Sequence, residues 1–175
     1  PGQRELPFFI HTRYSTQQAI LEDIVASLYA QGMRKLIILS GHGGNNFKGM
    51  IRDLAFVYPD FLIIAADWFS IVPPKDYFEA AVDDHAGESE TSVMMHYHPE
   101  LVNLDEAGDG ESKPFAIPSL NEKVGWAPRH WDKATVDSGV GNPKKASAEK
   151  GERYMKPVVE KLAKLFTEVG QGSLY

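Results

Sequence analysis

Two short, continuous apolar runs stand out in the pattern of hydrophobic and polar positions. They occupy residues 35–40 and 61–67 and lack the alternation that marks a half-exposed strand. Such runs are typical of strands buried on both faces of a parallel sheet. Between them, residues 46–57 carry apolar side chains at helical spacing. The pattern predicts a strand–helix–strand unit, with parallel strands and a right-handed crossover.

The remaining periodicity predicts further helices. They run from Ser15 to a stop at Gly32, over residues 77–82, over residues 88–96 and over residues 146–169. Ser15 and Gln18 are spaced as a capping box for the first of these helices. Pro157 predicts a kink or an interruption in the last one.

Residues 101–141 show no strong periodicity and are rich in Gly, Pro, Asp and Ser. So long an irregular stretch is more often functional or interface-forming than idle. Trp126 and Trp131 lie within it. They are candidates for stacking on a planar substrate, although burial or interface packing is the commoner role of such aromatic side chains.

Composition and charge describe an ordinary domain. The chain has 175 residues, with 18 Lys and Arg against 24 Asp and Glu, and a net charge of −6. No apolar run approaches the roughly 20 residues needed to cross a bilayer. The acidic balance and the absence of a Lys/Arg-rich block argue against nucleic acid as a partner. Because the first five residues lack the layout of a secretory signal, we expect a cytoplasmic protein.

The chain contains no cysteine. This excludes disulfides, thiolate zinc sites, iron–sulfur clusters and a cysteine nucleophile. Any metal ion would therefore have to be bound by His, Asp or Glu.

The first candidate site is the glycine-rich turn at residues 40–46. It follows the first predicted strand, at the sheet edge where open α/β folds bind ligands. Its three glycines allow a sharp turn and close approach to a bound group, and His42 is the titrating side chain among them. The alternatives are a tight turn with a structural histidine, or an anion-binding loop. Asp67 ends the second strand at the same edge of the sheet. Its side chain is predicted either to support His42 or to serve as the N-cap of the following segment.

The second candidate site is residues 83–92, which contain one histidine and four carboxylates. If a helix starts near residue 87, His85 and Glu88 converge at its first turn. The simpler alternative is a solvated acidic cap, with Asp84 or Ser89 as the N-cap residue. Two histidine-bearing turns in one small domain can face one pocket, which favours a functional interpretation.

Imidazole and carboxylate are the ligands that Zn²⁺ or Mn²⁺ accepts when thiolates are absent. Such an ion generates hydroxide near neutral pH, and a nearby His or Glu can move the proton to the leaving group. His42 and Glu88 are candidate ligands, with His85 as the proton carrier. Because catalytic zinc normally has three protein ligands, the set is incomplete.

Three segments, in order along the chain, carry a family resemblance. They are Ser40-Gly41-His42-Gly43-Gly44-Asn45, then His85-Ala86-Gly87-Glu88-Ser89-Glu90-Thr91-Ser92, then Gly139-Val140-Gly141-Asn142-Pro143 with Ala146-Ser147-Ala148-Glu149-Lys150-Gly151. Together they resemble motifs of the creatininase family of metal-dependent amidohydrolases. Ser40 replaces the usual Asn and Asn142 the frequent Asp, and the resemblance extends from about Ser15 onward.

The resemblance implies a three-layer α/β/α sandwich with a mostly parallel sheet, two divalent ions (Zn²⁺, Mn²⁺ or Fe²⁺) and a homo-oligomer. By analogy, His42 and Glu88 are metal ligands, His85 transfers the proton, and Glu90 is a further catalytic residue or the alternative carboxylate ligand. The substrate contacts are then assigned to Gly43, Gly44, Asn45, Asp84 and Trp126.

One family feature is missing from this sequence. Family members carry, ahead of the region matched here, a Glu-x-His pair and a downstream Asp that bridges the metals, and this chain contains no Glu-x-His. We therefore expect a single domain, residues 1–175, that lacks the first strand or strands and the metal-ligand loop of the complete fold. The alternative is a natural short form whose metal site is rebuilt across a subunit contact.

The predicted function is hydrolysis of a small cyclic amide, formamide or related carbonyl compound through metal-activated water. Gly43 and Gly44 stand where true creatininases carry Tyr and Glu, which counts against creatinine itself. The alternatives are a hydrolase of an oxidised cyclic polyol of the inositol type, a non-catalytic module without an intact metal site, and a nucleotide-binding domain.

Overall fold

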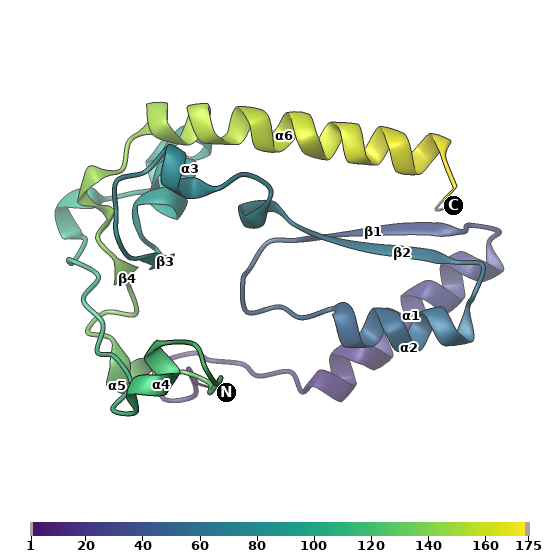
Figure 1. Cartoon of the computed structure of the whole chain (residues 1–175), viewed down its shortest axis with the longest axis horizontal. Helices are drawn as coiled ribbons and strands as arrows, with labels where there is room; N and C mark the ends of the chain where they lie inside the picture. Colours follow the sequence, from purple (N-terminus) through teal and green to yellow (C-terminus); the bar gives the residue numbers. More distant parts are fainter. Residues whose placement is uncertain (1, 174–175) are drawn as a thin grey trace. The chain divides into compact units, whose positions relative to one another are not determined.

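A computed structural model describes residues 2–173 (Figure 1). Its helices are α1 (Tyr14–Ala30), α2 (Lys48–Val57), α3 (Glu88–Tyr97), α4 (Pro118–Asn121), α5 (Trp131–Ala134) and α6 (Ala148–Gln171). Its strands are β1 (Lys35–Ser40), β2 (Leu62–Asp67), β3 (Asp83–His85) and β4 (Val140–Gly141). The chain divides into two compact units, each considered by itself: a β1–β2 unit (residues 12–72 and 157–173) and a β3–β4 unit (residues 2–11 and 73–156).

In the β1–β2 unit, the two strands pair in parallel, from Lys35 opposite Leu62 to Ser40 opposite Asp67. Helices α1 and α2 cover one side of the pair, and the C-terminal part of α6 runs along the other (Figure 1). The core between the sheet and the first two helices is formed by Leu21, Val25, Met50, Leu54, Phe61 and Ile63. The predicted strand–helix–strand unit is confirmed.

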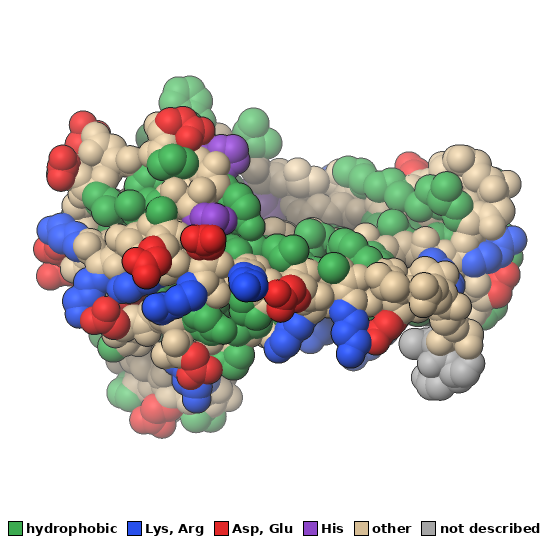
Figure 2. Space-filling model, turned by 90° about the horizontal axis from the view of Figure 1, so that it is seen from above, with side chains coloured by type: hydrophobic (Ala, Val, Ile, Leu, Met, Phe, Trp, Pro, Cys, Tyr) green, Lys and Arg blue, Asp and Glu red, His purple; other side chains and the backbone are tan. Residues whose placement is uncertain are grey.

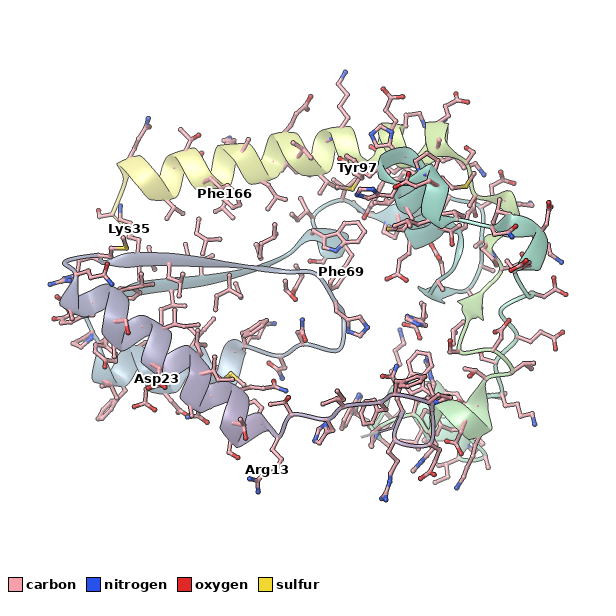
Figure 3. All side chains as sticks on the ribbon, turned by 180° about the vertical axis from the view of Figure 1, so that it is seen from behind. Arg13, Asp23, Lys35, Phe69, Tyr97 and Phe166 are labelled. Carbon is pink, nitrogen blue, oxygen red and sulfur yellow. The ribbon has the colours of Figure 1, made fainter. Side chains whose placement is uncertain are left out.

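Lys35 connects the first residue of β1 to the end of α6 within this unit (Figure 3). Its Nζ donates to the carbonyl oxygens of Val169, at 2.6 Å, and Gly172, at 2.5 Å. The last carbonyls of a helix have no partner in the helix itself, and positive charge is favourable there. The lysine therefore caps α6 from a distant part of the sequence.

Two local details differ from the sequence prediction. β1 is not buried on both faces, since Leu39 is 51% exposed. Helix α1 begins one residue before Ser15, and its N-cap residue, Arg13, makes no side-chain capping bond among the described residues. Gln17 instead donates from Nε2 to the carbonyl of Thr12, at 2.8 Å, so the predicted capping box is wrong. The predicted stop is confirmed, because Gly32 has a positive φ of 86°.

In the β3–β4 unit, β3 pairs antiparallel with β4, so that His85 lies opposite Val140. Helix α3 packs against the start of α6, where the Ser147 N–H donates to Ser92 Oγ at 3.2 Å. A side chain at position 151 would collide with the Ser92 carbonyl, so this close helix approach requires Gly151. Tyr154 on α6 is buried edge-on against Phe78, at 5.1 Å between ring centroids.

The predicted helix at residues 77–82 is wrong. A 3₁₀ turn at Pro74–Asp76 precedes an irregular segment, in which the N–H groups of Glu79 and Ala80 donate to the Glu88 side chain. These donors are therefore unavailable to a helix. The helix predicted at 88–96 is confirmed by α3. Helix α6 continues through Pro157, so the interruption predicted there as one possibility does not occur.

The described sheets are one parallel pair and one antiparallel pair, in a fold that mixes helices and strands. The three-layer sandwich with a mostly parallel sheet stays a prediction. Among residues 2–173, no helix combines the length and the apolar character needed to cross a bilayer. On the face shown in Figure 2, basic and acidic side chains are interspersed.

Candidate functional site

The glycine-rich turn lies at the carboxyl end of β1, as predicted. The Asn45 N–H donates to the His42 carbonyl at 3.1 Å, which closes a tight turn. Asn46 Oδ1 then accepts from the Lys48 N–H at 3.2 Å, at the start of α2. These hydrogen bonds join residues close in sequence, and Trp68 Nε1 adds one from further along the chain, to the Gly41 carbonyl at 3.4 Å.

The His42 side chain takes part in its own turn. Its Nδ1 accepts a hydrogen bond from the Gly44 N–H at 2.9 Å. Because a backbone N–H can only donate, Nδ1 carries no proton, and the neutral ring carries its proton on Nε2. A histidine that binds a metal through Nε2 normally donates from Nδ1 to an oxygen. For His42 to bind a metal through Nε2, the proton that this contact assigns to Nε2 would have to move to Nδ1.

The other residues predicted at this turn have contacts within the β1–β2 unit. Gly43 lies beside the Phe69 ring, 3.8 Å from where its Cβ would be. Asn45 Nδ2 donates to Ser40 Oγ at 3.4 Å. Asp67 ends β2 opposite Ser40 and precedes a 3₁₀ turn, but its side chain makes no capping bond within the described part of the chain. The Asp67 side chain therefore does not cap the 3₁₀ turn, which was its alternative predicted role.

The second candidate turn connects β3 to α3. Ala86 has a φ of 49°, in the left-handed region, and Gly87 is the N-cap residue of α3. A side chain at position 87 would collide with the Asp83 carboxylate. Both oxygens of that carboxylate accept from the Ser89 N–H at 3.2 Å. Asp83 thus caps the helix, whereas the sequence suggested its neighbours Asp84 or Ser89.

Glu88 is completely buried. Its Oε2 accepts from the N–H groups of Glu79 and Ala80, both at 2.8 Å, and its Oε1 accepts from Lys150 Nζ at 2.5 Å. The carboxylate therefore connects the segment before β3 with α3 and α6. That Glu88 binds a metal stays a prediction; in the structure its oxygens bind these three donors.

Lys150 also contacts Glu79, whose Oε1 lies 3.1 Å from Nζ. The hydrogen bond to Glu88 is the main cause of a raised pKa at Lys150, and the bond to Glu79 adds to it. In turn, hydrogen bonds from Lys145 and Lys150 lower the pKa of Glu79 to about 2. Acidic and basic side chains thus alternate in the network of hydrogen bonds that supports this turn.

His85 and Glu90 come together at this turn. Glu90 Oε2 accepts from the Ala86 N–H at 2.7 Å and lies 3.9 Å from His85 Nδ1. The His85 ring packs edge-to-face on Trp131, with 4.9 Å between centroids. An imidazole, a carboxylate and an indole are therefore assembled in one unit of the fold.

Two of the predicted substrate contacts are also in this unit. Asp84 Oδ2 forms an ion pair with Arg129 Nη2 at 2.6 Å, and Trp126 is 86% exposed. The roles of Arg129 and Lys150 were not predicted from the sequence. Lys150 lay within the third motif, but its partner is 62 residues away, and no local pattern identifies that pairing.

The predicted site residues thus divide between the units. His42, Gly43, Gly44, Asn45 and Asp67 belong to the β1–β2 unit, while Asp84, His85, Glu88, Glu90 and Trp126 belong to the β3–β4 unit. In residues 2–173, no group of three His, Asp or Glu side chains is arranged to hold a metal ion. Within either unit, the described side chains by themselves therefore do not form a metal centre.

Comparison with known families agrees with these motifs. The family model for creatininase, described as creatinine amidohydrolase, matches residues 1–166. The chain belongs to the creatininase family, as the three motifs predicted.

The names of individual relatives specify different substrates. The mycofactocin precursor peptide peptidase of Mycobacterium ulcerans is 33% identical over 131 residues, covering 72% of this chain and 45% of that protein. The creatinine amidohydrolase of Pseudomonas putida is 25% identical over 170 residues, covering 88% and 63%. A crystal structure of a Bacteroides fragilis protein assigned as a creatinine amidohydrolase is 83% identical, with a TM-score of 0.97, covering 100% of this chain and 69% of that one. The chain spans about half the length of the curated relatives it matches.

Proposed function

We propose that this chain carries catalytic residues of a hydrolase that cleaves the bond between a carbonyl carbon and nitrogen. The substrate class is a small cyclic amide, a formamide or a related carbonyl compound. Family membership supports hydrolysis, and the two relatives named above act, by name, on a cyclic amide and on a peptide. The observation that carries the proposal is the pairing of His85 with Glu90 at the turn between β3 and α3.

The chemistry of these two side chains fits the reaction. Water replaces the nitrogen on the carbonyl carbon, and the departing nitrogen must gain a proton as its bond breaks. Imidazole is the side chain best suited to that transfer near neutral pH. His85 delivers the proton in this proposal. Glu90 is attached to the turn through the Ala86 N–H, with its Oε2 3.9 Å from His85 Nδ1. Glu88, with its three donors, instead holds the turn together.

A substrate panel tests the role of His85. Creatinine, an N-formyl amine, a dipeptide and an inosose-type cyclic ketone are offered to the chain, and to His85→Ala and His98→Ala variants. His98 is the matched control because it is exposed and pairs with Glu100. We expect His85→Ala to lower turnover on the order of 100-fold or more, and His98→Ala to leave it unchanged. Equal turnover of a hydrolysed panel member by the two variants contradicts the proposal.

Metal dependence is a separate prediction, with His42 and Glu88 as the expected ligands. Because the described side chains do not form a group of three, we derive no catalytic step through a metal ion. Equilibrium dialysis against Zn²⁺ or Mn²⁺ tests it directly. Lower metal content in His42→Ala than in His98→Ala supports His42 as a ligand, and equal content removes it. A homo-oligomer and a cytoplasmic location also stay predictions.

A further inference from the structure

The side chains of Asp84, His85, Arg129 and Trp131 form a connected set of contacts. The imidazole packs edge-to-face on Trp131, with an interplanar angle of 72°. The Arg129 guanidinium lies over the same indole, 4.9 Å from its centroid. Arg129 Nη2 also pairs with Asp84, the residue that precedes His85. The loop at 129–131 therefore contacts the β3 end at two successive residues.

Trp131 is itself held firmly. Its N–H donates to the Gly2 carbonyl at 2.8 Å, and its carbonyl accepts from Thr135 Oγ1 at 2.7 Å. It is also the first residue of α5. The backbone from which the indole projects towards the imidazole is thus held by two hydrogen bonds.

The ion pair in this set contributes little to stability. The side chains of Arg129 and Asp84 are 32% and 55% exposed, and pairs this exposed to solvent add little to the free energy of folding. Orientation is a better explanation. The second torsion of a histidine side chain is intrinsically broad, so its neighbours decide where the ring nitrogens point. Glu90 lies 3.9 Å from Nδ1, beyond hydrogen-bond distance, so the indole supplies a constraint that this carboxylate does not.

We propose that Trp131 and Arg129 are positioning residues for His85. The edge-to-face contact restricts rotation of the imidazole and keeps Nδ1 towards Glu90. Arg129 holds the indole in place by lying over it and bonding to Asp84. The importance of this positioning for turnover rests on the proposed role of His85 in proton transfer, but the positioning itself can be measured without any substrate.

Chemical modification of the imidazoles tests the positioning. Diethyl pyrocarbonate labels histidines at rates that depend on ring access, and peptide mass spectrometry resolves His85 from the others. We expect labelling of His85 to accelerate several-fold in Trp131→Leu, to return close to the parent rate in Trp131→Phe, and to rise less in Arg129→Gln. His98 serves as the internal reference and keeps its rate in every variant. Unchanged labelling of His85 in Trp131→Leu overturns the proposal.

Values of kcat and KM, measured with a substrate of the panel that the protein hydrolyses, distinguish this proposal from the proposed function. Trp131→Leu should lower kcat at least tenfold, with a change in KM of less than twofold, and Trp131→Phe should recover most of the loss. If His85→Ala abolishes turnover while Trp131→Leu leaves kcat unchanged, the positioning role is wrong and the function stands. If His85→Ala has no effect on turnover, the proposed function is wrong, and the labelling rates still decide whether Trp131 orients the ring.

Discussion

In the turn around His42, the histidine ring accepts a backbone N–H of its own turn, whereas carboxylates perform that task in the turn around His85. The hydrogen bonds of the His42 turn mainly join neighbours in sequence, with one more from Trp68 Nε1 to the Gly41 carbonyl. The His85 turn depends on buried Glu88 and on Lys150, from a helix that is distant only in sequence. The difference shows what leaves an imidazole available for other contacts. When carboxylates accept the backbone N–H groups of a turn, the histidine ring is not needed as their acceptor, and in the His85 turn it packs on Trp131 instead.

The largest expected effect comes from breaking the buried network beneath the His85 turn. Lys150→Met leaves the Glu88 carboxylate buried without its cation, which should lower the free energy of unfolding by about 3 kcal/mol. Urea denaturation measures the change. Lys164→Met, on the same helix in an exposed pair with Glu168, is the matched control and should cost less than about 0.5 kcal/mol. Similar losses in the two variants would mean that Glu88 does not depend on Lys150.

A methyl group added to one glycine of each turn sharpens the comparison. In Gly87→Ala the new methyl meets the Asp83 carboxylate, so we expect a loss of about 1–3 kcal/mol. In Gly41→Ala no described atom lies within 4 Å of the new methyl, and the backbone there is not left-handed. That variant should be neutral, or more stable by up to about 1 kcal/mol. Thermal unfolding compares the two, and an equal fall in Tm would contradict the difference between the turns.

The smallest expected effect depends on pH. The pKa of Glu79 is lowered to about 2, from an ordinary value of 4.5, so its bonds to Lys145 and Lys150 add stability above pH 4.5 that is lost as the pH falls towards 2. Glu79→Gln should therefore be less stable than the parent at pH 6, with a difference that shrinks on acidification. Urea midpoints between pH 6 and pH 2 measure it, with Glu168→Gln as the control, because Glu168 is equally exposed and lies 3.7 Å from Lys164. A difference that stays constant across this range would exclude the linkage.

Elements defined by local spacing were predictable from the sequence. The apolar runs at 35–40 and 61–67 identified β1 and β2, and the motif around Gly87 marked the start of α3. The three motifs also identified the family that the family model confirms. In each case the signal lies within about ten consecutive residues.

The supporting contacts were not predictable, because they join distant residues. Asp84 and Arg129 are 45 residues apart, and Glu88 and Lys150 are 62 apart. The failed helix at 77–82 has the same origin. Its backbone donors bind the side chain of Glu88, which belongs to a later helix, and no periodicity of residues 77–82 reports such a partner.

The left-handed backbone of Ala86 limits which amino acids that position accepts. Glycine adopts this conformation without penalty, asparagine and aspartate do so fairly readily, and β-branched side chains do so very poorly. A library randomised at position 86 and selected for folding should thus return mainly glycine, asparagine, aspartate and the resident alanine. Ala86→Gly offers a route to a more stable turn that leaves the neighbouring His85 and Glu90 in the sequence.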